Sequence, residues 1–143
     1  MQLSQRMSRM CSALAILVMG CSVGLAQAEW WEATRSTSGG LTAYIDPTTI
    51  RIDQKHELVK MWALYDFKTV EKFHQASYLS LKSQQQYDCI EGRSRTLAQS
   101  FFEGHMGDGD VVFTDSTERS WNPVAPGSMG ESLWRLACLN VNR

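Results

Sequence analysis

A pair of cysteines, Cys89 and Cys138, constrains the fold more than any other feature of the chain, because no other cysteine follows an N-terminal export signal. Exported proteins mature in an oxidising compartment, where an even number of cysteines most simply forms disulfides. The bridge would close a loop of about 50 residues, which the chain-entropy model equates with roughly 4 kcal/mol of stabilisation. A redox or metal-binding pair is the alternative, but there is no C-x-x-C and the spacing fits no zinc site. We therefore predict a structural disulfide.

The export signal lies at the N-terminus and has all three of its usual parts. The first residues carry two arginines and no acid, residues 10–19 form an apolar run, and Ala-Gln-Ala at 26–28 matches a small-residue cleavage site. The apolar run is short for the roughly 20 residues that a membrane-spanning helix needs. We expect residues 1–28 to be a signal peptide cleaved after Ala28, and residues 29–143 to form one domain.

A second processing route is indicated by Val18-Met19-Gly20-Cys21, which resembles a bacterial lipoprotein box with Cys21 as the lipidated residue. Met19 is atypical of that box, and residues 23–25 do not form a polar tether. The soluble form cleaved after Ala28 is therefore favoured over a lipid-anchored form.

The charge balance argues against a nucleic-acid partner. The 143 residues contain 14 Lys and Arg against 15 Asp and Glu, and removal of the signal leaves 12 bases and 15 acids. Nucleic-acid-binding domains usually carry a strongly basic surface. We expect no nucleic-acid partner, and no membrane span in the mature chain.

Segments of alternating or apolar residues predict β-strands joined by Gly- and Pro-rich turns. The expected strands are 29–34, 41–45, 50–53, 58–67, 77–89, 93–102 and 111–114. Residues 58–67 are apolar on both faces, which indicates a central strand covered on both sides. The polar residues 68–76 are expected to form a loop, and the polar residues 83–86 indicate either a wet face or a β-bulge.

The last element is predicted to be a helix that begins after Ser128, since Glu131 completes an S-x-x-E capping box. Its apolar stripe at helical spacing consists of Leu133, Trp134, Ala137, Cys138 and Val141. Many antiparallel strands followed by one helix indicate an α+β fold. We expect an antiparallel sheet of about six strands with the C-terminal helix packed on it and one disulfide.

No residue pattern predicts catalysis, a metal or a cofactor. The histidines His56, His74 and His105 lack metal-ligand spacing and are expected in solvated loops. Residues 108–110 (Asp-Gly-Asp) fit a tight turn better than a calcium loop. Ser128 only half-matches a nucleophile elbow and has no later histidine.

Two neighbouring tryptophans, Trp30 and Trp31, are the candidate contact residues. In a strand adjacent side chains point to opposite faces, so one of the two must point away from the core. An alternative site, suited to a small ligand carrier or hydrolase, would be a dry pocket formed by Asp66, Arg93 and Arg95. We expect those arginines to pair instead with acids of the sheet such as Asp66 or Asp88.

Several short motifs follow one another in an order that resembles the bacterial surface-adhesin protein E family. They are residues 44–51 (YIDPTTIR), 62–66 (WALYD), 88–89 (DC) with Arg93 and Arg95, Trp121, 124–128 (VAPGS) and Cys138. The resemblance implies a small α+β fold, an envelope location and a non-catalytic adhesin that binds host matrix proteins such as vitronectin and laminin and can dimerise. It assigns no binding residue, because the matched motifs belong to the scaffold.

Three functions follow from these observations. The first is an exported, non-enzymatic envelope protein in the periplasm or at the cell surface. It would bind a host matrix protein or an envelope component through an exposed sheet face or an edge strand, by β-augmentation or self-association along an edge. The second is a periplasmic structural or accessory protein on the same scaffold, without adhesive role. The third, a small ligand carrier or hydrolase, lacks a nucleophile–base pair.

Overall fold

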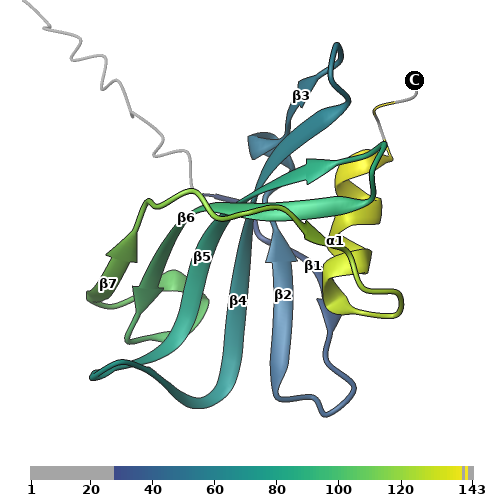
Figure 1. Cartoon of the computed structure of the whole chain (residues 1–143). Helices are drawn as coiled ribbons and strands as arrows, with labels where there is room; N and C mark the ends of the chain where they lie inside the picture. Colours follow the sequence, from purple (N-terminus) through teal and green to yellow (C-terminus); the bar gives the residue numbers. More distant parts are fainter. Residues whose placement is uncertain (1–27, 140, 142–143) are drawn as a thin grey trace, which may run out of the picture.

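One antiparallel sheet carries most of the chain in the computed structural model, which describes residues 28–139 and 141. The strands along its main path lie in the order β1-β2-β4-β5-β6-β7, while β3 pairs with β4 and β8 with β6 (Figure 1). The elements are β1 Trp31–Arg35, β2 Leu41–Ile45, η1 Pro47–Thr49, β3 Arg51–Asp53, β4 Leu58–Phe73, β5 Ala76–Asp88, β6 Arg93–Phe102, η2 His105–Gly107, β7 Val111–Asp115, β8 Asn122–Pro123 and α1 Met129–Cys138. Residues 1–27 of the expected signal segment, among them Cys21, lie outside the described residues.

The expectation of about six strands is wrong, because the sheet has eight. The main path has six, and the two further strands, β3 and β8, are only three and two residues long. β8 contains Pro123, which pairs with Arg93 at the edge of the sheet, a position that tolerates a residue without a backbone N–H. β3 lies within the expected strand 50–53, so β8 is the strand that the sequence did not predict, because two residues leave no periodicity.

The predicted loop at 68–76 is also wrong, because β4 runs on to Phe73 and turns directly into β5. The register shifts between Asp66 and Glu71, so a bulge interrupts the pairing and hides the alternation. His74 adopts a left-handed φ of 53° in the turn, and the Phe73 ring stacks on Phe101 with centroids 5.1 Å apart. The aromatic contact stabilises a hairpin whose polar residues suggested a loop.

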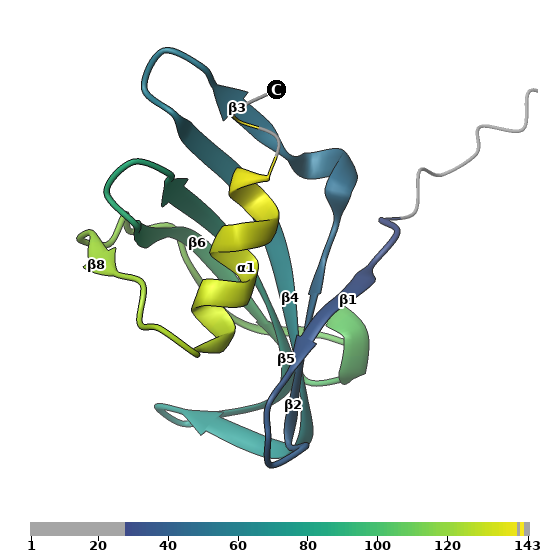
Figure 2. The same ribbon diagram turned by 90° about the vertical axis from the view of Figure 1, so that its right-hand side faces the viewer.

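The main core lies between α1 and one face of the sheet, and Figure 2 shows the helix lying across that face. Val59, Met61 and Ala63 of the central strand β4 are buried against the helix side. Leu64 points to the other face and is also fully buried, as expected for a strand covered on both sides. The buried members of the core are Ala43, Ile45, Val59, Met61, Ala63, Tyr87, Leu133, Ala137 and Val141.

The helix begins as its capping sequence predicts. The Ser128 side chain accepts a hydrogen bond from the backbone N–H of Glu131. The Glu131 carboxylate reaches back one residue further than in an ideal capping box and accepts from the N–H of Gly127, at 2.6 Å. The apolar stripe then faces the sheet, with Leu133 and Ala137 buried.

The predicted disulfide between Cys89 and Cys138 is present, with the two Cα atoms 5.7 Å apart. It joins the residue after β5 to the last residue of α1. The Trp134 indole N–H donates to the backbone carbonyl of Asp88 at 2.9 Å, beside the bridge. The helix is therefore attached to the sheet both by the disulfide and by the Trp134 hydrogen bond. No helix among the described residues is both long and apolar enough to cross a membrane.

Candidate functional site

The two candidate tryptophans lie at the start of β1, which is an edge strand of the sheet. Trp31 is 57% exposed, whereas Trp30 is half-buried and its ring centroid lies 6.0 Å from the Nζ of Lys82. Trp30 also lines an open hollow of about 680 Å³ together with Lys82 and Met106. The neighbouring side chains thus have different surroundings, and Trp31 is the one presented to solvent.

The glycine-rich loop at residues 104–110 forms one wall of this hollow. Two polar side chains of the sheet, Asp66 and Ser80, bind it by hydrogen bonds. Asp66 accepts from the N–H of Met106 at 2.6 Å and lies 3.2 Å from Nδ1 of His105. Ser80 donates to the carbonyl of Gly104 and accepts from the N–H of Gly107. The loop is therefore fastened to β4 and β5 rather than extended into solvent.

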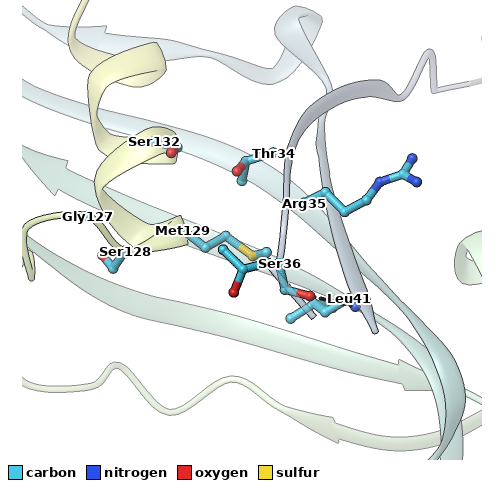
Figure 3. A pocket seen from close by; sticks show the side chains of 9 residues that line it. Thr34, Arg35, Ser36, Leu41, Gly127, Ser128, Met129 and Ser132 are labelled. Carbon is cyan, nitrogen blue, oxygen red and sulfur yellow. Dashed lines mark hydrogen bonds between the residues drawn. The ribbon is translucent and has the colours of Figure 1, made fainter. Parts of the chain in front are cut away.

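A second depression separates β1 from the first turn of α1 and measures about 330 Å³. Figure 3 shows Thr34 and Ser132 facing one another, and the Met129 side chain reaching from α1 toward Ser36 and Leu41. The Ser128 hydroxyl at its end accepts from Glu131 and donates to the carbonyl of Ala125 at 2.6 Å. Those partners give Ser128 a capping role, and none of them is a base that would activate a nucleophile.

The arginines of β6 form a cluster around Trp121 rather than a pocket with Asp66. Arg93 donates through Nε to Asp88 at 2.9 Å, as expected, and its guanidinium lies 5.0 Å from the Trp121 ring centroid. Arg95 donates to Gln86, pairs with Glu118 and lies 4.4 Å from the same ring. Asp66 instead contacts His105 and Met106, so the dry pocket that would indicate a ligand carrier is not assembled.

Among residues 28–139 and 141, no group of three His, Cys, Asp or Glu side chains is arranged to hold a metal ion. His56 contacts Asp53 at 2.8 Å, and residues 105–107 form a short 3₁₀ turn. Burial raises the pKa of Tyr65 to about 12 and that of Tyr87 well above its ordinary value, so both phenols are neutral at physiological pH. Both tyrosines therefore act as neutral packing groups in the interior.

Asp88 is a buried carboxylate whose pKa is changed by its surroundings in the fold. Burial alone would raise its pKa, but the N–H of Glu91, the Arg93 side chain and the N–H of Ile90 outweigh it and lower the pKa. The ionised carboxylate therefore stabilises the folded chain above the unfolded-state pKa of about 4, and this contribution is lost as the pH falls below that value.

We expect Asp88→Asn to lower the free energy of unfolding by about 2 kcal/mol at pH 7, because the amide cannot accept all three hydrogen bonds. The difference from the unchanged protein should shrink between pH 4 and pH 3, measured by urea unfolding at each pH. Asp53→Asn is the matched control, since Asp53 is exposed on a hairpin and its loss should change little. A difference for Asp88 that is constant down to pH 3 would contradict the role given to its charge.

The sequence did not predict the hydrogen bonds that hold residues 104–107 on the sheet. It also did not predict that Lys82 and Met106 line the hollow beside Trp30. Asp66 is 40 residues from Met106, and Ser80 is 27 residues from Gly107. No local pattern connects such positions, because a sheet register brings them together. The one available signal was Asp66, a carboxylate that follows the largely apolar stretch from Met61 to Tyr65 in β4.

The chain is similar to known proteins over almost all of its described length. The family model described as Surface-adhesin protein E matches residues 30–139. Among solved structures, crystal form II of Haemophilus influenzae protein E aligns with a TM-score of 0.59 at 13% identity, covering 81% of this chain and all of that one. The selenomethionine form of the same protein aligns with a TM-score of 0.58 at 14% identity, covering 80% and 92%. No curated protein sequence matches the chain.

Proposed function

The chain belongs to the surface-adhesin protein E family, and from that membership we propose that it is an exported, non-enzymatic envelope protein that binds a macromolecular partner. The family match over residues 30–139 carries this proposal, because it spans nearly all of the expected mature domain. The partner class we infer is a host matrix protein or an envelope component. The expected cleavage after Ala28 would make Glu29 the first residue of the domain and Trp30 the second.

The surface that we assign to the partner is the outer edge of β1 with Trp31. β1 ends the strand order, so within residues 28–139 and 141 one side of its backbone has no strand partner. An extended segment can add to such an edge by main-chain hydrogen bonds, and an exposed aromatic beside it supplies an apolar anchor. Trp31 stands at the first position of this strand and is mostly exposed.

Binding to immobilised vitronectin and laminin tests the proposal with the exported protein purified from producing cells. We expect saturable binding to at least one of them at micromolar concentration, weakened at least tenfold by Trp31→Ala, since exposed tryptophans are frequent binding hot spots. Ile90→Ala is the matched control, because Ile90 is 65% exposed but follows β5 instead of β1.

Two results would count against the proposal. If neither matrix protein shows saturable binding, the adhesive role fails. If Trp31→Ala and Ile90→Ala bind as well as the unchanged protein, the partner uses another surface. Protease treatment of intact cells separates the two locations: digestion places the domain at the cell surface, and protection places it in the periplasm.

A further inference from the structure

A row of polar side chains crosses four strands on the face of the sheet opposite α1. The register pairs Arg51 of β3 with Lys60 of β4, Lys60 with Gln86 of β5, and Gln86 with Arg95 of β6. Directly paired residues share a face, and neighbouring strands lie about 4.8 Å apart, so the row is roughly 14 Å long. Lys60 alternates with the buried Val59 and Met61, which places this cationic row on the side away from the helix.

One end of the cationic row is held rigidly by its neighbours. The Oε1 atom of Gln86 accepts from Nε of Arg95 at 2.9 Å and from a terminal nitrogen of Arg95 at 2.7 Å. Glu118 pairs with the other terminal nitrogen of Arg95, and the Trp121 ring packs on the guanidinium. Oε1 is committed to Arg95, so the donor that the mostly buried Gln86, which is 6% exposed, can present at this surface is its side-chain N–H₂ group.

The other end of the cationic row lines a depression of about 270 Å³. Arg51 donates to the carbonyls of Thr48 and Ile50, and within residues 28–139 and 141 neither Arg51 nor Lys60 has a carboxylate at salt-bridge distance. The acid in the lining is Asp53, which pairs with His56. Two cations and an amide N–H₂ therefore meet in a depression that suits anionic oxygens.

We propose that the cationic row binds a sulfated polysaccharide, with one sulfate in the depression between Arg51, Lys60 and Gln86 and the chain running toward Arg95. Sulfate oxygens accept several charge-assisted hydrogen bonds at once, which matches the donors present. A peptide strand fits this place poorly, because the backbones of β4 and β5 are already paired on both sides within the sheet. The site is separate from the β1 edge and does not depend on the proposed function.

Heparin is the probe that tests this site, in titrations of the exported protein at several salt concentrations. We expect micromolar binding that weakens with salt, and a loss of at least tenfold in the double variant Arg51→Gln/Lys60→Gln. Lys68→Gln/Lys72→Gln is the matched control, because it removes two exposed charges from the other end of β4 and should change the affinity less than twofold. Thermal unfolding of both variants checks that they are folded.

Four outcomes would overturn the proposal: no saturable heparin binding, equal losses in the two double variants, equal affinity for desulfated heparin, or poly-glutamate binding as tightly as heparin. The last would assign the cationic row to an acidic protein segment. Trp31→Ala should leave heparin binding unchanged, so failure at the β1 edge and failure at the cationic row are distinguished by the same set of variants.

Discussion

Replacing both Cys89 and Cys138 with serine is expected to lower the free energy of unfolding by about 4 kcal/mol, the largest effect of any change considered for this fold. The bridge joins residues 49 apart, and its removal returns that loop entropy to the unfolded chain. It also releases the C-terminal end of α1, a ten-residue helix that would be marginal without tertiary contacts. Urea unfolding of the double variant and of the unchanged protein measures the difference, and the melting temperature should fall by roughly 15 °C.

Reduction of the unchanged protein is the control for this experiment, because it breaks the same bond without altering packing. The reduced protein and the double variant should unfold at similar urea concentrations. A double variant within 1 kcal/mol of the oxidised protein would show that the helix is held by packing alone, and that the bridge contributes little to the fold.

The features that were predictable from the sequence are those that a few residues determine by their own chemistry. Two cysteines in an exported chain have few alternatives to pairing, and Ser128 with Glu131 marks a helix start through the orphan N–H groups that they satisfy. The central strand was predictable over residues 58–67, because this stretch has apolar residues on both faces and both faces are covered.

The features that escaped prediction depend on the register between strands. The hairpin at 68–76 carries a bulge and polar residues, so its sequence resembles that of a loop. The stacking of Phe73 on Phe101, which stabilises the hairpin, is a contact between distant residues. At 83–86 the sequence leaves a wet face and a bulge as alternatives, and the shift of the β5–β6 register between Gln84 and Gln85 bears out the bulge, with Ser83 and Gln86 buried. In both places the tertiary context decides what local propensity leaves open.

The cationic row shows the same limit for surface sites. Arg51, Lys60, Gln86 and Arg95 are separated by 9 to 26 residues in sequence, and each looks like an ordinary solvated side chain on its own. Only the pairing of four strands aligns them. A binding face built across strands therefore has no linear motif, whereas one built on a single loop or helix does.

Leu133→Ala is expected to destabilise the protein by about 3 kcal/mol, since the change deletes a side chain that is 1% exposed and leaves a cavity between α1 and the sheet. Leu139→Ala is the matched control: the same chemical change at a position 63% exposed should stay within about 0.5 kcal/mol. Urea unfolding of both variants decides whether the helix face is packed as the structure describes, and equal effects would contradict it. The same substitution in the protein without the disulfide separates the two attachments of α1. If Leu133 loses its effect there, the helix docks only while the bridge holds it; if the effect persists, packing alone places the helix and the bridge adds to a contact that already forms.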